Sequence, residues 1–194
     1  MIRWDSRQIS QGGQGRGEDR LAIWLDGDRL LVIVCDGAGG IPGGARAADL
    51  ACAALLRGAP EDPAALLSRV DLALEADPFA GECTAVVAWA SPEGAWGASC
   101  GDSAAFVDGV EVTRGQHRKR RLGSGRARPV SFRQSGRRLL VCTDGLSGVV
   151  RGEALASALA ARRLSGSCQA LVDAARMPGG ELVDDLALVL VDLG

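Results

Sequence analysis

Short hydrophobic runs recur along the chain, and their spacing predicts strands and helices. Leu30–Cys35 (LLVIVC) is a continuous apolar run rich in β-branched residues, which is typical of a buried strand. Leu21–Leu25 precedes it as a shorter strand, and Asp26–Asp28 between them is a turn signal because Asp and Gly tolerate positive φ. These two runs are therefore expected to pair as a β-hairpin.

Two helices are predicted after this hairpin. Ala45–Arg57 is rich in Ala and Leu. Pro63–Ala76 places Leu66, Val70 and Leu74 one turn apart, so that they form a single apolar stripe. Prolines before and after the second helix limit its length.

The later segments repeat the order of strands followed by two helices. We predict a meander of three strands at Thr84–Ala90, Ala95–Cys100 and Ala104–Val107, followed by an irregular basic region, residues 111–128. A buried strand is expected at Arg137–Thr143. Two helices, Gly152–Arg163 and Ser167–Arg176, then precede a last strand at Leu186–Leu193. Hairpins and paired helices argue against a doubly wound parallel sheet. Two stacked antiparallel sheets with helices on both outer faces fit, and without a linker or repeat residues 1–194 are expected to form one domain.

The composition is that of an ordinary globular protein. Of the 194 residues, 47% are hydrophobic and 24% are charged, and the net charge is −2, so the chain as a whole is not a binder of polyanions such as nucleic acid. No apolar run approaches the roughly 18 residues that span a bilayer, and the polar start of the chain has no signal-peptide core. A cytoplasmic protein that does not enter membranes is expected, and its oligomeric state is left open.

Six cysteines are spread along the chain, and no two form a CxxC pair, so a zinc knuckle is not expected. Most lie inside apolar stretches, where Cys behaves as a small hydrophobic residue. Buried, reduced thiols are the favoured interpretation, and disulfides or a catalytic thiol are the alternatives.

Acidic residues recur where hydrophobic strands begin or end. They are Glu18-Asp19, Asp36-Gly37, Asp102, Asp144-Gly145 and Asp184-Asp185. Any one Asp-Gly pair is most simply an ordinary turn. Several carboxylates gathered at strand ends are costly to bury unless they surround a hard dication such as Mg²⁺ or Mn²⁺, which prefers oxygen ligands. The pattern therefore predicts a metal site, although the spacing alone does not name a reaction.

Six motifs, in order, resemble the metal-dependent serine/threonine protein phosphatases (the PPM or type-2C family) in a compact bacterial form. The matching segments are GEDR at Gly17–Arg20, LLVIVCDGAGG at Leu30–Gly40, GECTAVVA at Gly81–Ala88, GASCGDSAAFV at Gly97–Val107, RRLLVCTDGLSGVV at Arg137–Val150 and ELVDDLALVLV at Glu181–Val191. The resemblance implies a four-layer α/β/β/α sandwich with two central antiparallel sheets and a metal site at their rim.

The resemblance also implies roles for individual residues. Asp36 would bridge two Mn²⁺ or Mg²⁺ ions, and the Gly37 carbonyl would join it. Asp144 and Asp184 would ligate one ion, and Glu18 and Asp19 would hold water on the ions. Asp102, with Asp144, would hold a weaker third ion. Hydrolysis would proceed by attack of a water activated by the two metals, with no covalent intermediate.

The chain departs from the family pattern at several positions. Ala38 stands where many members have a histidine that protonates the leaving group, and the single histidine, His117, lies in the basic region. Arg16 is the candidate for the phosphate-binding arginine, by a loop shift, and its guanidinium fork suits a phosphate. The alternative is that Arg16 is an ordinary surface charge. Gly17 replaces an Asn of the family pattern, and Ala104 replaces an Arg. In the last motif Asp184 matches the family's metal-binding Asp and Asp185 replaces an Asn, so Asp184 is the preferred metal ligand of the two.

The predicted function is a Mn²⁺/Mg²⁺-dependent protein phosphatase that acts on phosphoserine and phosphothreonine and opposes a bacterial Ser/Thr kinase. The alternative is a pseudophosphatase, a regulatory module that docks a kinase or phosphoprotein, and a distant third is another two-metal phosphoesterase. The basic stretch Arg114–Arg128 could steer an acidic phosphoprotein or be a solvated loop; it lacks the aromatic residues of a nucleic-acid site.

Overall fold

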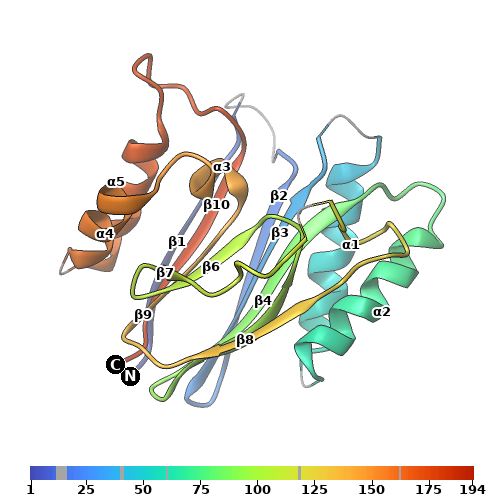
Figure 1. Cartoon of the computed structure of the whole chain (residues 1–194), viewed down its shortest axis with the longest axis horizontal. Helices are drawn as coiled ribbons and strands as arrows, with labels where there is room; N and C mark the ends of the chain where they lie inside the picture. Colours follow the sequence, from blue (N-terminus) through green and yellow to red (C-terminus); the bar gives the residue numbers. More distant parts are fainter. Residues whose placement is uncertain (12–16, 40–41, 60, 118, 162) are drawn as a thin grey trace.

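A computed structural model describes residues 1–11, 17–39, 42–59, 61–117, 119–161 and 163–194 of the protein. In these residues ten strands form two five-stranded antiparallel sheets (Figure 1). The β3 sheet has the order β2 (Asp19–Asp26), β3 (Arg29–Gly37), β4 (Cys83–Ser91), β5 (Gly94–Cys100) and β8 (Val130–Gln134). The β10 sheet has the order β1 (Arg3–Ile9), β10 (Leu186–Asp192), β9 (Arg138–Cys142), β6 (Ala104–Val107) and β7 (Val110–Glu111).

Helices cover the outer face of each sheet. Figure 1 shows α1 (Gly44–Arg57) and α2 (Pro63–Glu75) beside the β3 sheet, and α4 (Gly152–Ala160) and α5 (Leu164–Ala175) beside the β10 sheet. The short helix α3 (Asp144–Ser147) follows β9 directly. The predicted α/β/β/α sandwich with two central antiparallel sheets is therefore confirmed.

The alternation of side chains along β3 separates two parts of the core. Leu30, Val32 and Val34 pack between the two sheets, whereas Leu31 and Ile33 pack beneath the helices. Since side chains alternate with a period of two, both faces of this strand must be apolar, which explains its continuous hydrophobic run. The same parity places residue 36 on the face that points toward the other sheet.

The predicted hairpin of β2 and β3 is confirmed, with Asp26 opposite Arg29 across its turn. The stripe of Leu66, Val70 and Leu74 is buried on α2, also as predicted. All six cysteines are free, and five of them are buried.

The predicted three-strand meander is wrong in its last strand. β4 pairs with β5, but β6 leaves that sheet and pairs with β7 and β9. Gly101, at φ +102°, redirects the chain between β5 and β6, because this conformation is open to glycine and rarely to other residues. Strands β1, β7 and β8 and helix α3 were not predicted; β1 and β8 are edge strands with half-exposed polar sequences.

No described helix has both the length and the apolar surface needed to cross a membrane.

Candidate metal site

Asp36 lies at the end of β3, on the rim between the two sheets. It stands directly opposite Asp19 on β2 and Thr84 on β4. The three side chains therefore project from one face of the sheet, toward the β10 sheet. The rigid ladder, rather than a loop, sets the position of Asp36.

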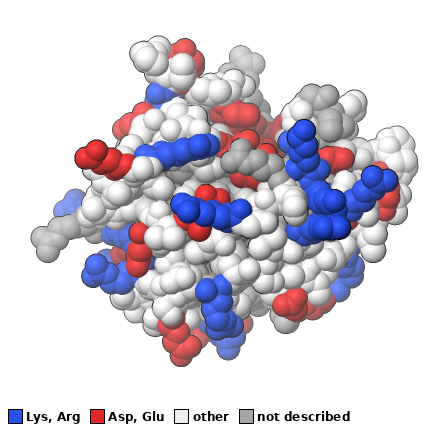
Figure 2. Space-filling view, in the orientation of Figure 1, with Lys and Arg blue, Asp and Glu red and all other residues white. Residues whose placement is uncertain are grey.

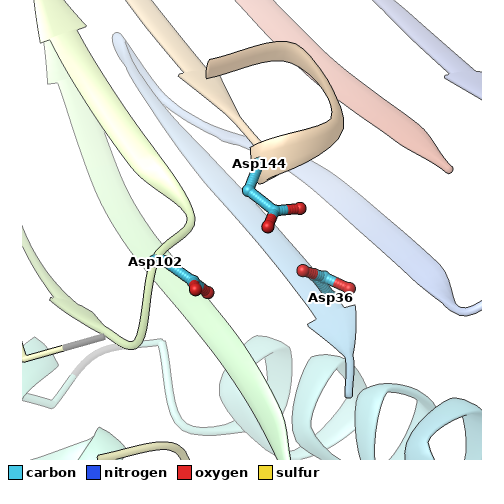
Figure 3. A group of neighbouring side chains, drawn as sticks. All are labelled: Asp36, Asp102 and Asp144. Atoms are coloured by element: carbon cyan, nitrogen blue, oxygen red, sulfur yellow. The ribbon is translucent and has the colours of Figure 1, made fainter. Parts of the chain in front are cut away.

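Three carboxylates from distant parts of the chain converge on this rim. Asp36 comes from β3, Asp102 from the turn between β5 and β6, and Asp144 from the first position of α3 (Figure 3). One oxygen from each lies within 4.8 Å of the others. Asp102 Oδ1 is buried and has no hydrogen-bond partner, so it is available to a ligand.

Asp19 is fully buried next to this group. Its Oδ2 accepts a hydrogen bond of 2.8 Å from the hydroxyl of Thr143, the last residue before α3. The same hydroxyl accepts a hydrogen bond of 2.9 Å from the backbone N–H of Ala187 on β10. Thr143 thus connects the carboxylate of one sheet with the backbone of the other.

The gathered carboxylates resist ionisation. Burial, with repulsion from Asp19 and Asp144, raises the pKa of Asp36 to about 9. Burial also raises the pKa of Asp19 to about 7, opposed by the hydrogen bond from Thr143. A dication would reverse this balance, because a nearby positive charge favours the ionised forms.

A cavity of about 320 Å³ opens onto these groups. Its lining includes the predicted site residues Glu18, Asp36, Gly37, Asp144 and Asp184. The predicted metal residues Asp19 and Asp102 do not line the cavity. Asp19 stands opposite Asp36 on β2, and Asp102 converges with Asp36 and Asp144. Asp184 faces the same cavity but is not one of the three converging carboxylates.

Two departures from the family pattern, Gly17 and Asp185, are neighbours in space. Asp185 Oδ2 accepts a hydrogen bond of 2.5 Å from the backbone N–H of Glu18, and Oδ1 accepts one of 2.8 Å from Gln11. A Cβ on Gly17 would lie 2.0 Å from Asp185 Oδ2. The missing side chain at residue 17 therefore makes room for an aspartate whose two oxygens hold the segment that carries Glu18.

Gly145 is required by a close approach of two backbones. A Cβ at this position would lie 1.9 Å from the carbonyl oxygen of Asp185. Glycine after Asp144 thus lets α3 pack against the chain that enters β10. This packing brings Asp144 and Asp184 to the same cavity.

The positions that correspond to the family's phosphate-binding arginine and proton-donating histidine, and the single histidine, differ in where they lie. Arg16 lies outside the described residues. Ala38 lines the cavity and is buried, so it brings no proton donor. His117 is exposed and does not line the cavity. Arg121, which the sequence marked only as a member of the basic stretch, does line it.

The residues present fit a hard dication. Every acidic group at the cavity offers carboxylate oxygen, the ligand that Mg²⁺ and Mn²⁺ prefer, and no described His or Cys lines it. The unpartnered Asp102 Oδ1 and the raised pKa values of Asp19 and Asp36 also indicate a site for a dication. Each observation is what is expected of a group that a cation would stabilise.

Solved bacterial serine/threonine phosphatases are similar to the structure along its whole length. Stp1 from Staphylococcus aureus gives a TM-score of 0.77 at 17% sequence identity, over 100% of this chain and 96% of that one. The S. agalactiae serine/threonine phosphatase gives 0.81 at 16% identity, over 100% of both chains. The catalytic domain of PstP, solved with two manganese ions, gives 0.74 at 22% identity, over 98% of this chain and 97% of that one.

No protein-family model and no curated protein matches the sequence. The likeness is carried by the order and packing of the elements, and at these identities it establishes the fold. The resemblance that the six motifs indicated is confirmed at this level: the chain has the two-sheet fold of the bacterial serine/threonine phosphatases.

Proposed function

We propose that this protein is a metal-dependent phosphatase that hydrolyses phosphoserine and phosphothreonine in proteins. The observation that carries the proposal is the convergence of Asp36, Asp102 and Asp144 within 4.8 Å on the rim of this fold. Solved structures that share the fold are bacterial serine/threonine phosphatases, and one of them holds two manganese ions. Residues 1–194 act as one catalytic domain in this proposal.

In this proposal the acidic residues at the end of β3 and beside it have separate roles in holding the metal ions. Asp36 and the Gly37 carbonyl would together hold Mn²⁺ or Mg²⁺ at the end of β3. Asp144 and Asp184 would help to hold one of the ions. Two such ions, when bound, supply an activated water and neutralise charge on the phosphoryl oxygens.

The remaining acidic residues act around this centre. Glu18 and Asp19 orient water in the cavity, and Thr143 keeps Asp19 in place by donating to its Oδ2. Asp102 and Asp144 would hold a third, weaker cation. This role uses the one buried Asp102 oxygen that lacks a protein partner.

The leaving serine or threonine oxygen needs a proton. Ala38 has none to give, and His117 is exposed outside the cavity. We therefore assign the proton to water in the cavity rather than to a side chain. This assignment predicts that His117→Ala retains turnover.

A direct test is the release of phosphate from a phosphothreonine peptide and from an aryl phosphate, with and without Mn²⁺. Metal-dependent release from both is expected. Calorimetry of Mn²⁺ binding is the companion measurement. Absence of release together with absence of Mn²⁺ binding would overturn the proposal and favour a module that only binds phosphoproteins.

A further inference from the structure

Arg121 lines the cavity together with the carboxylates. Among the described residues that line the cavity, it is the one basic residue. Its Nε is buried and has no hydrogen-bond partner. None of the ion pairs in the described part of the chain involves Arg121. An arginine that is partly buried beside acids and yet unpaired requires an explanation.

The backbone around Arg121 is held against the β3 sheet. Leu122 and Cys83, the first residue of β4, exchange two backbone hydrogen bonds of 2.9 and 3.0 Å. The Cys100 thiol donates to the carbonyl of Arg120 at 2.8 Å. The residues on both sides of Arg121 are therefore tied to strand ends, as Asp36 is.

A buried carboxylate on α2 holds the rest of this loop. Asp71 Oδ1 accepts hydrogen bonds from the backbone N–H groups of Gly123 and Gly125, and Oδ2 accepts one from Ala127, at 2.8, 3.1 and 2.9 Å. A charged acceptor of three backbone donors fixes a loop strongly. The position of Arg121 is thus built into the fold rather than left to a mobile surface arm.

We propose that Arg121 binds the phosphoryl oxygens of the substrate. This inference rests on the proposed phosphatase function. The guanidinium fork can donate two parallel hydrogen bonds to a phosphoryl group, and its Nε lacks any other acceptor. The phosphoryl group would then lie in the cavity between Arg121 and the cations that Asp36 and Asp144 would hold. Its oxygens would meet positive charge from the guanidinium and from the cations.

The competing explanation is that Arg121 only offsets the negative charge of the acidic group. In that case it would pair with a carboxylate, and the described structure contains no such ion pair. The two explanations also differ in their effect on metal and phosphate binding. Removing a mere counter-charge would raise the affinity for Mn²⁺ and leave the affinity for phosphate almost unchanged, whereas removing a phosphate-binding group would lower the affinity for phosphate.

Figure 2 shows basic side chains gathered beside the acidic region in the upper part of the view. Arg126, exposed in the same loop and absent from the cavity wall, provides a matched control. Its loss removes the same charge from the same segment without removing a donor from the cavity. A contribution from the general field of the loop would therefore appear equally in both variants.

The experiment compares full-length wild type, R121A, R121K, R126A and R16A. The KM for 4-nitrophenyl phosphate and the inhibition constant of inorganic phosphate are measured with Mn²⁺ present. Calorimetry gives the affinity for Mn²⁺ and, in Mg²⁺ buffer, for inorganic phosphate without turnover. We expect R121A to weaken phosphate binding about ten- to a hundredfold, as for a lost hydrogen bond to a charged group. R121K should recover part of this loss, and R126A should stay within about twofold of wild type.

The outcomes separate the two proposals. If wild type hydrolyses the ester and R121A keeps its KM and inhibition constant, the inference is wrong and the phosphatase function stands. If wild type binds phosphate and R121A does not, while neither hydrolyses the ester, Arg121 is the phosphate ligand and the activity is wrong. A loss of phosphate affinity confined to R16A, or a gain of Mn²⁺ affinity in R121A with unchanged phosphate affinity, would also overturn the inference. If wild type neither binds phosphate nor acts on the ester, both fail.

Discussion

The hydroxyl of Thr143 donates a 2.8 Å hydrogen bond to the buried carboxylate of Asp19 and so connects the two sheets at the site. The two residues lie 124 positions apart in the chain. The same hydroxyl accepts the Ala187 N–H, so one side chain satisfies a donor and an acceptor that are both buried. The rim of the sandwich is therefore locked at the point where the carboxylates meet.

Thr143→Val should lower the free energy of unfolding by about 1–3 kcal/mol, because it leaves a buried carboxylate and a buried N–H without a partner. Thr143→Ser keeps the hydroxyl and is the matched control. Urea denaturation of both variants measures the difference. Equal stability of the Val and Ser variants would show that this hydrogen bond contributes nothing.

Asp36→Asn should lower phosphate release by at least about a hundredfold, because the amide offers one neutral oxygen where two ions require a carboxylate. Mn²⁺ affinity, measured by calorimetry, should fall with it. Asp26→Asn, at the exposed far end of β2, should behave as wild type. Near-normal turnover of Asp36→Asn would refute the bridging role.

Metal-free protein should lose stability as the pH rises. Burial raises the folded-state pKa of Asp19 to about 7 and that of Asp36 to about 9, from an ordinary value of 3.8. The folded state therefore holds protons that the unfolded chain has released, and its stability falls from about pH 4 up to about pH 7 for Asp19 and about pH 9 for Asp36.

Thermal melts between pH 5 and 9, with a chelator and with excess Mn²⁺, measure this slope. We expect Tm to fall with pH in the chelator series and much less with Mn²⁺. Asp36→Asn should flatten the chelator series, since the amide does not titrate. A Tm that rises with pH in metal-free protein would contradict the assigned burial of these carboxylates.

Gly17→Ala should destabilise the protein more than Gly27→Ala does. Both glycines have φ +61°, so both substitutions incur the same backbone strain of about 1–3 kcal/mol. A Cβ at residue 17 additionally meets Asp185 Oδ2, whereas a Cβ at residue 27 meets open space. The difference between their free energies of unfolding isolates the contact with Asp185. Identical values would mean that Asp185 moves aside without cost.

Asp71→Ala should loosen the loop that carries Arg121, because three backbone N–H groups lose their acceptor. We expect a loss of at least about 1.5 kcal/mol in the free energy of unfolding. Faster amide hydrogen exchange at Gly123, Gly125 and Ala127 should accompany it. Asp28→Ala, in the exposed turn of the β2–β3 hairpin, is the control. Unchanged exchange in Asp71→Ala would show that the loop is held by other contacts.

The sequence predicted the elements that carry a clear hydrophobic pattern of their own. The continuous run of β3 required a strand buried on both faces, and the stripe on α2 required a helix packed on one face. Parity along β3 then determined the face on which Asp36 lies. The edge strands β1 and β8 lacked this signal, because a strand with a half-exposed polar sequence is defined by its partner rather than by its own pattern.

The candidate site shows the same division. The sequence by itself determined that acidic residues stand at strand ends, and hence that Asp36 and Asp144 would meet a common rim if the strands came together. Only the tertiary structure decided that β6 crosses to the other sheet, which brings Asp102 beside Asp36, and that Asp185 fills the space left open by Gly17.

Tertiary structure alone also singled out Arg121 among the basic residues of its loop. The path of that loop depends on Asp71, about fifty positions earlier, and on the pairing of Leu122 with Cys83. Contacts between residues so far apart arise from packing, because neither partner carries a local preference for the other. Strand and helix formation is a local property of the chain, whereas the placement of the two sheets and the position of Arg121 at the cavity are not.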